Sequence, residues 1–230
     1  MNVDPPTAAQ PAAPALVNVS IAGCAPFAGL LWQARVLALA RWPQRLPHGG
    51  AGGVSRMADL VEAWPLLAEP LQALCADPQV RLEIATAGVP LGALRLHAPV
   101  QSPQVYCTIG NYRCQLLEAA ADLDDGPTGA QAGARQALAL GAIEQRLRGG
   151  EPYVCLKGSA CLAGPHDDLP VPAAHATLDW EVEIGVVIGR RTWQVPVHDA
   201  LGAVAGYCVV NDITLRERIF RQEPKVMGTD

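Results

Sequence analysis

The chain has 230 residues, of which 50% are hydrophobic, and it carries a formal net charge of −5. This is enough apolar material for one large domain, or for a small and a larger domain, each with a buried core. The acidic balance, without any run of Lys or Arg, argues against nucleic acid as a partner. Because the sequence shows neither a signal-peptide pattern nor an 18-residue apolar stretch, we expect no membrane partner and a cytoplasmic location.

The first 100 residues predict a tail and a small domain. Residues 1–14 are rich in Ala and Pro without an apolar period, which predicts a disordered tail. Residues 15–100 predict a small N-terminal α/β domain. Its expected elements are strands at Leu16–Ile21 and Leu30–Ala40, helices over about 56–63 and from Pro65 to Cys75, and further strands at Val80–Ile84 and Val89–Leu96.

A Pro-rich change in composition near residue 100 predicts a domain boundary, with a second domain over residues 101–230. The Ala- and Leu-rich segment Ala130–Arg148 ends in two glycines, as a helix with a C-terminal glycine stop would. The other expected elements are a strand at Gln104–Ile109, a helix ending near Ala121, strands at Tyr153–Lys157, Asp179–Ile188 and Tyr207–Thr214, and a short helix near Asp199–Val204.

Two of these apolar strands carry closely spaced acidic residues. Alternate side chains of a strand point to opposite faces, so Asp179, Glu181 and Glu183 would share one face. In the later apolar run Gly206–Arg216, Asp212 and Arg216 would share a face in the same way. Neighbouring carboxylates that are half-buried in a sheet repel one another unless they are protonated or bind a cation.

This pattern has two interpretations. Carboxylates alone are hard oxygen ligands, which suit Mg²⁺, Mn²⁺ or Ca²⁺ and argue against zinc, for which Cys and His would be expected. Alternatively, the segment is a solvated edge strand whose acidic residues only keep it soluble. Spacing alone leaves both open.

Four motifs together resemble the fumarylacetoacetate hydrolase family in their order and spacing over residues 105–230. They are Gly110-Asn111-Tyr112, Leu156-Lys157-Gly158-Ser159, Asp179 to Glu183 with Val187-Ile188-Gly189, and Val204 to Tyr207 with Asn211 to Arg216. The resemblance implies an α+β fold, in which a mixed β-roll catalytic domain of a homodimeric enzyme follows a small N-terminal α/β domain. Residues 15–100 resemble the family's variable N-terminal domain only loosely.

The resemblance also implies roles for individual residues. Glu181, Glu183 and Asp212 match the carboxylates that hold one Mg²⁺ or Mn²⁺. Arg216 matches the arginine that meets the substrate carboxylate, and Tyr112 belongs to a motif expected to contact substrate.

Lys157 has two interpretations. It matches a position where many family members carry an active-site lysine. Alternatively, it is a lysine at a strand end with its ammonium group in water.

The sequence departs from the family pattern in its water-activating pair. Hydrolases of the family carry Asn-Tyr-x-x-His-x-x-Glu, whereas here Gln115 replaces the histidine and Glu118 is retained. A glutamine can orient a water or hydrogen-bond Glu118, but it cannot accept and return a proton near neutral pH. Water activation would then fall to Glu118 alone, or the reaction would need no histidine.

A second departure concerns the last residues. In family members, the segment that resembles Met227–Asp230 continues into a stretch with a substrate-binding lysine and then into further strands of the roll. On this comparison we expect a catalytic domain that is truncated at its C-terminus.

The resemblance implies a divalent-metal-dependent hydrolase or lyase that breaks a C–C bond of a small acylpyruvate or β-diketo acid, as in aromatic or sugar-acid catabolism. Two alternatives remain. One is a non-hydrolytic member of the family, namely an enol–keto isomerase, a decarboxylase or a hydratase. The other is a truncated and catalytically inactive relative that only binds metal.

Overall fold

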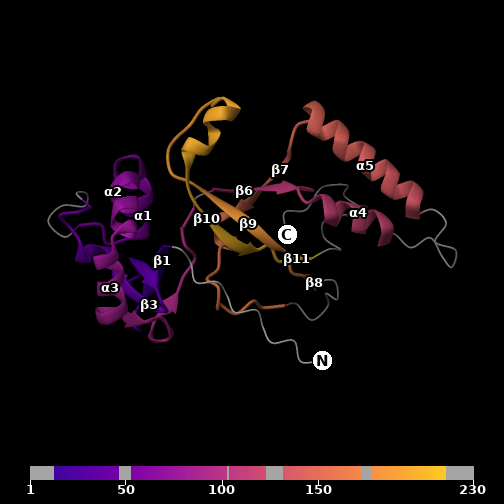
Figure 1. Ribbon diagram of the computed structural model, residues 1–230. Helices are drawn as coiled ribbons and strands as arrows, with labels where there is room; N and C mark the ends of the chain where they lie inside the picture. The colour runs from indigo at the N-terminus through magenta and orange to yellow at the C-terminus, as the bar shows by residue number, and fades with distance from the viewer. Residues whose placement is uncertain (1–12, 47–52, 103, 123–131, 172–177, 216–230) are drawn as a thin grey trace. The chain divides into compact units, whose positions relative to one another are not determined.

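The computed structural model describes residues 13–46, 53–102, 104–122, 132–171 and 178–215 (Figure 1). Its described residues fall into two compact units. One contains the residues up to Gln101 together with those from Leu162 onward, and the other contains Ser102–Cys161. Residues 1–12, which make up most of the predicted tail, lie outside the described residues. The predicted division into a tail and two domains stays a prediction.

The N-terminal part of the first unit contains a five-stranded antiparallel sheet with the order β4-β3-β2-β1-β5. Its strands are β1 (Ala15–Ser20), β2 (Phe27–Trp32), β3 (Arg35–Ala38), β4 (Val89–Pro90) and β5 (Arg95–Leu96). The prediction of β1 is confirmed. The prediction of one strand over Val89–Leu96 is wrong in its middle, because a 3₁₀ turn at Leu91–Ala93 separates β4 from β5.

The prediction of one strand over Leu30–Ala40 is wrong, because the chain turns back within it. Gln33 and Ala34 form a two-residue loop between β2 and β3, with φ values of 49° and 59°. Positive φ at both loop residues is the backbone that two-residue hairpins require, and Asn or Gly usually provides it. Gln and Ala give no such signal, so the turn is not visible in the sequence.

Three helices follow β3 in the chain, namely α1 (Met57–Glu62), α2 (Trp64–Ala76) and α3 (Pro78–Ala87). The first two confirm the predicted helices. The predicted strand at Val80–Ile84 is wrong, because this segment lies inside α3. Val80 and Ile84 are buried and one helical turn apart, whereas Leu82 between them is 57% exposed. Asp77 caps the helix, since its carboxylate accepts the N–H of Gln79 at 2.8 Å.

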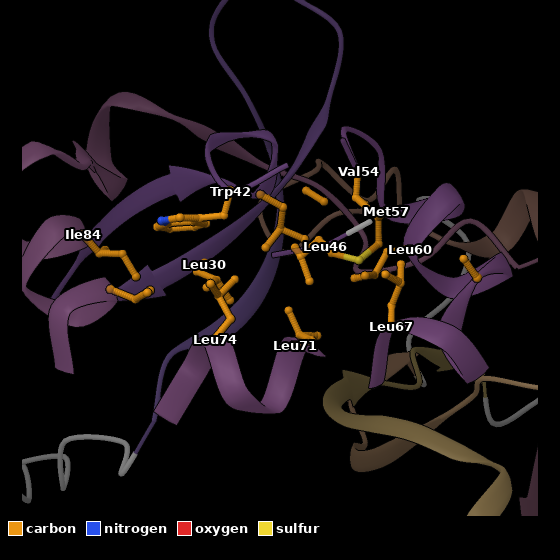
Figure 2. Close-up of a cluster of buried hydrophobic side chains, with 14 residues drawn as sticks. Leu30, Trp42, Leu46, Val54, Met57, Leu60, Leu67, Leu71, Leu74 and Ile84 are labelled. Atoms are coloured by element: carbon orange, nitrogen blue, oxygen red, sulfur yellow. The ribbon is translucent and has the colours of Figure 1, made fainter. Parts of the chain in front are cut away.

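These helices and the sheet share one hydrophobic core (Figure 2). It combines Ala28 and Leu30 of β2 with apolar side chains from all three helices and the segments between them. Burial of each large aliphatic side chain contributes about 1.5–3 kcal/mol, so this core accounts for the stability of the N-terminal part. The labelled members are Leu30, Trp42, Leu46, Val54, Met57, Leu60, Leu67, Leu71, Leu74 and Ile84.

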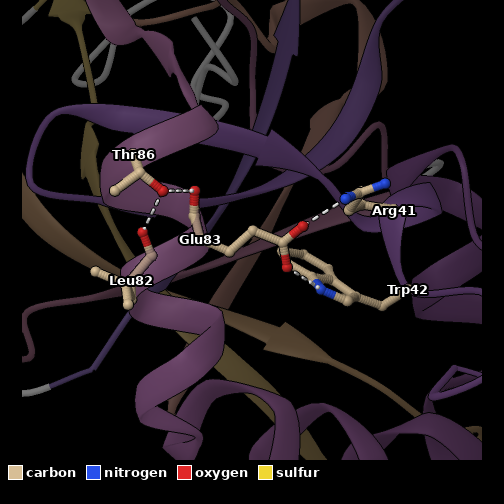
Figure 3. A network of polar contacts seen from close by, with 5 residues as sticks. All are labelled: Arg41, Trp42, Leu82, Glu83 and Thr86. Atoms are coloured by element: carbon tan, nitrogen blue, oxygen red, sulfur yellow. Dashed lines mark hydrogen bonds and ion pairs between the residues drawn. The ribbon is translucent and has the colours of Figure 1, made fainter.

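A polar network joins α3 to the turn after β3 (Figure 3). Arg41 Nε donates to one carboxylate oxygen of Glu83 at 2.6 Å, and Trp42 Nε1 donates to the other at 3.0 Å. These two donors, with Arg41 the larger contributor, lower the pKa of Glu83 below its ordinary value. The hydroxyl of Thr86 donates to the carbonyl of Leu82 at 2.8 Å, which closes one turn of the helix.

The second unit contains a two-stranded antiparallel sheet and two helices. The strands are β6 (Gln104–Ile109) and β7 (Tyr153–Gly158), and the helices are α4 (Arg113–Asp122) and α5 (Ala132–Gly149). All four agree with the predicted elements to within a few residues. Arg135 Nε of α5 donates to the carbonyl of Ala120 in α4 at 2.9 Å, and this hydrogen bond joins the two helices.

The remaining elements lie beyond residue 177. They are β8 (Leu178–Asp179), β9 (Val182–Ile188), a 3₁₀ helix at Val197–Ala203, β10 (Val204–Asn211) and β11 (Thr214–Leu215). The architecture is therefore α+β, with antiparallel strand pairs throughout the described residues. No helix among the described residues is both long enough and apolar enough to cross a membrane.

Candidate metal centre

The acidic residues predicted to bind metal lie between two strand ladders that share one register. Strands β9 and β10 pair antiparallel up to the pair Val182 and Asn211. Strands β8 and β11 pair in the same register, with Asp179 opposite Thr214. Between the two paired segments, two residues on each strand belong to neither ladder, Trp180–Glu181 on one and Asp212–Ile213 on the other.

This register explains how residues thirty positions apart come together. If the register of β9 and β10 is extended by one pair, Asp212 lies opposite Glu181. Glu183 is two residues along the same strand, so it shares the face of Glu181. Carboxylate oxygens of the three residues lie within 4.8 Å of one another, and all three residues are half-buried. The structure thus brings Glu181, Glu183 and Asp212 together, and their role as metal ligands stays a prediction.

Hydrogen bonds hold the backbone between the two ladders in place. The N–H of Asp212 donates to the carbonyl of Glu181 at 2.8 Å. The N–H of Glu181 donates to the side-chain oxygen of Asn211 at 3.0 Å, and the hydroxyl of Thr214 donates to the carbonyl of Asp212 at 3.0 Å. Asp179, predicted on the same face as the two glutamates, accepts the N–H of Trp180 on its carboxylate at 2.9 Å. The backbone beside two of the three predicted ligands is thus fixed by hydrogen bonds on both strands.

The strand next to the cluster is packed closely. A Cβ placed on Gly185 would lie 2.8 Å from Cys208 Sγ and 2.9 Å from Val210 Cγ1. These two side chains therefore occupy the space beside Glu183 that a larger residue at Gly185 would need. Burial also raises the pKa of the Cys208 thiol, so less of it is in the thiolate form that binds soft metals. This cysteine is therefore a packing residue and a poor ligand for such metals.

The donor set fits a hard divalent cation. Three half-buried carboxylates this close together repel one another, and a cation removes that cost. Oxygens that share an octahedral Mg²⁺ or Mn²⁺ lie roughly 3 Å apart, so modest side-chain rotations bring these oxygens into range. Three protein ligands leave coordination positions for water and a bidentate substrate.

The predicted catalytic residues lie in the other unit. Gln115 and Glu118 are exposed and three residues apart on α4, so they are neighbours on the helix surface. Tyr112 lies just before α4, and its carbonyl accepts the N–H of Leu116 at 3.1 Å. Lys157 is half-buried in β7, opposite Val105. Their place at the metal centre stays a prediction.

Arg216, the predicted substrate-binding arginine, lies outside the described residues. Asn211 and Thr214 form part of the site but were not singled out from the sequence. Their sequence signal is their place in the motif Asn211 to Arg216, on either side of Asp212, and their roles depend on the strand register.

Comparison with known proteins identifies the family. The fumarylacetoacetate (FAA) hydrolase C-terminal family matches residues 104–229, which is more than half of the chain. The chain therefore belongs to the fumarylacetoacetate hydrolase family, as the motifs predicted.

The curated relatives match a shorter segment. A protein from Burkholderia cenocepacia strain HI2424 and one from Burkholderia multivorans strain ATCC 17616, both named as hydrolases, are each 48% identical over 67 residues. That segment is 29% of this chain and 24% of each relative. The match thus spans about a quarter of the length of these relatives.

Solved structures show the same fold over most of the chain. A protein described as HpcE from Mycobacterium smegmatis is similar with a TM-score of 0.57 and 21% identity, over 93% of this chain and 60% of that one. Maleylpyruvate hydrolase from Sphingobium sp. SYK-6, solved with manganese(II) and pyruvate, is similar with a TM-score of 0.54 and 17% identity, over 90% of this chain and 61% of that one. The predicted α+β fold of the fumarylacetoacetate hydrolase type is confirmed.

Proposed function

We propose that the protein is a divalent-metal-dependent enzyme that cleaves a C–C bond of a small acylpyruvate or β-diketo acid. The observation that carries this proposal is the carboxylate cluster of Glu181, Glu183 and Asp212, held between the two strand ladders. Membership of the fumarylacetoacetate hydrolase family supports it. The similar fold of maleylpyruvate hydrolase, whose crystal structure contains manganese(II) and pyruvate, is consistent with Mg²⁺ or Mn²⁺ as the cofactor.

The proposed mechanism assigns a task to each residue. When bound by the three carboxylates, the divalent ion would supply a Lewis acid that stabilises developing enolate charge. Arg216 would bind the substrate carboxylate through two parallel hydrogen bonds, which orients the substrate. Glu118 would take a proton from the attacking water, whose oxygen bonds to the carbonyl carbon as the C–C bond breaks, and would return that proton to the carbon of the leaving enolate.

Three further residues would assist. Gln115 would orient the water by hydrogen bonding, without a change of protonation state. Tyr112 would contact the substrate, and Lys157 would place a positive charge near the leaving enolate. We further propose a homodimer in the cytoplasm, with a small keto acid as its partner and neither nucleic acid nor membrane.

Activity assays test this proposal directly. The purified protein would be stripped with a chelator, reloaded with Mg²⁺ or Mn²⁺, and assayed for pyruvate release from acetylpyruvate. We expect turnover that requires metal and is lost in Glu183→Gln. Glu69→Gln is the matched control, because Glu69 is an exposed acid on α2. Equal turnover with and without metal would contradict the proposal, and binding of metal without any turnover would favour an inactive relative.

One observation favours a second candidate function. Gln115 stands where hydrolases of the family carry a histidine, and glutamine cannot serve as a general base. Enol–keto isomerisation or decarboxylation would not need that base, and a divalent ion held by the three carboxylates would supply the positive charge that favours either reaction. Faster ketonisation or decarboxylation of a keto diacid than cleavage of acetylpyruvate would favour the non-hydrolytic function.

A further inference from the structure

The segment between the two ladders has an unusual hydrogen-bond pattern at Glu181 and Asp212. In an antiparallel sheet, residues that form a hydrogen-bonded pair exchange two N–H···O bonds. One of the two is present, because the N–H of Asp212 donates to the carbonyl of Glu181 at 2.8 Å. The reciprocal bond would run from the N–H of Glu181 to the carbonyl of Asp212.

That reciprocal bond is replaced by two side-chain bonds. The N–H of Glu181 donates instead to the side-chain oxygen of Asn211, at 3.0 Å. The carbonyl of Asp212 accepts the hydroxyl of Thr214, at 3.0 Å. Both backbone groups thus have a side-chain partner at this pair, and pairing resumes in the same register at Asp179 and Thr214.

We propose that Asn211 is a positioning residue for the metal centre. Its side-chain oxygen fixes the backbone of Glu181 relative to that of Asp212, and thereby the separation of two of the three carboxylates. The proposal rests on the metal site of the proposed function. Asn211 is not itself offered as a ligand, because it is adjacent to Asp212 in the strand and so points to the opposite face.

The chemistry of Asn at this position is specific. The acceptor must lie on a short side chain of the residue before Asp212, so that it reaches the N–H across the strands. Aspartate keeps an acceptor of the same length and adds a fourth negative charge, which attracts a cation. Serine is too short to reach, and alanine has no acceptor.

A Mn²⁺ titration of four variants tests the proposal. Loss of a group that hydrogen-bonds to a metal-ligand residue without contacting the metal typically lowers metal affinity by roughly 10–100-fold. We therefore expect Asn211→Ala to weaken Mn²⁺ binding by about that factor. Asn211→Asp should bind Mn²⁺ as tightly as the wild type or more tightly. Val209→Ala is the matched control, since Val209 is 80% exposed on the same strand and the same face. It should leave Mn²⁺ affinity unchanged.

A second readout separates positioning from general stability. The electron paramagnetic resonance spectrum of bound Mn²⁺ should broaden in Asn211→Ala and stay like the wild type in Asn211→Asp, because the spectrum reports the symmetry of the ligands. If Asn211→Ala does not melt cooperatively, the Mn²⁺ affinity and the spectrum are measured on Asn211→Ser instead. Its side chain is polar but too short to reach the N–H of Glu181.

The outcomes are distinguishable. Unchanged affinity and spectrum in both Asn211→Ala and Asn211→Ser, with metal binding by the wild type intact, would overturn the positioning role alone. An equal loss of affinity in Asn211→Asp and Asn211→Ala would overturn it as well. Absence of Mn²⁺ binding by the wild type would overturn the proposed function and this inference together.

Discussion

Replacement of Gly185 by alanine should destabilise the protein and weaken its metal site. A Cβ at this position would lie 2.8 Å from Cys208 Sγ and 2.9 Å from Val210 Cγ1, closer than carbon and sulfur atoms normally approach. The backbone itself does not require glycine, because Gly185 is not among the residues with positive φ. Alanine lowers the conformational entropy of the unfolded chain, which raises the free energy of unfolding by about 0.4–1 kcal/mol. Overpacking of the folded state lowers it by about 1–3 kcal/mol. The free energy of unfolding should therefore fall, by up to about 2.6 kcal/mol.

Urea unfolding and Mn²⁺ titration of Gly185→Ala check this prediction. Val210 lies opposite Glu183, so its displacement should also lower the Mn²⁺ affinity. A second substitution, Cys208→Ala, removes one of the two clashing atoms and should recover part of the lost stability, with a coupling of about 0.5–3 kcal/mol. Unchanged or higher stability in Gly185→Ala, or strict additivity of the two substitutions, would refute the packing argument.

Three further predictions follow from individual residues. Gln115→His should raise acylpyruvate hydrolysis, by up to 10²–10⁴-fold for a well-placed general base; an unchanged rate in a steady-state assay would show that this position does not activate water. The lowered pKa of Glu83 means that its carboxylate contributes fully to stability above the ordinary carboxyl pKa, and that this contribution is lost as the pH falls through the lower folded-state pKa. The urea midpoints of the wild type and of Glu83→Gln should therefore converge in acid. A difference between the two midpoints that stays constant with pH would contradict this prediction. Burial raises the pKa of the Cys75 thiol, so mass spectrometry should find it alkylated more slowly than exposed Cys24.

The cluster of three carboxylates could be predicted because two simple regularities coincide in these residues. Alternation along a strand places Glu181 and Glu183 on one face, and the family motifs identify Asp212 as their partner. The structure brings the three carboxylates within 4.8 Å. The role of Asn211 could not be predicted in this way, because it depends on the register between two strands and on where their pairing stops.

The errors in the fold have equally local causes. In α3, Val80, Leu82 and Ile84 alternate as a strand would, but only the first and last are buried. The helix follows from features that alternation does not report, namely the cap at Asp77 and the proline after it. Over such a short segment, apolar residues spaced two apart, as in a strand, are also spaced four apart, as in a helix. Tertiary packing therefore decides between the two structures.

Glu181, Glu183 and Asp212 are proposed to form one divalent-metal site. Calorimetric titration with Mn²⁺ tests this proposal most directly. We predict about one Mn²⁺ per chain in the wild type and in Glu69→Gln, and severely weakened binding in Glu183→Gln and in Asp212→Asn. Mn²⁺ affinity that is the same in all four proteins would contradict the account.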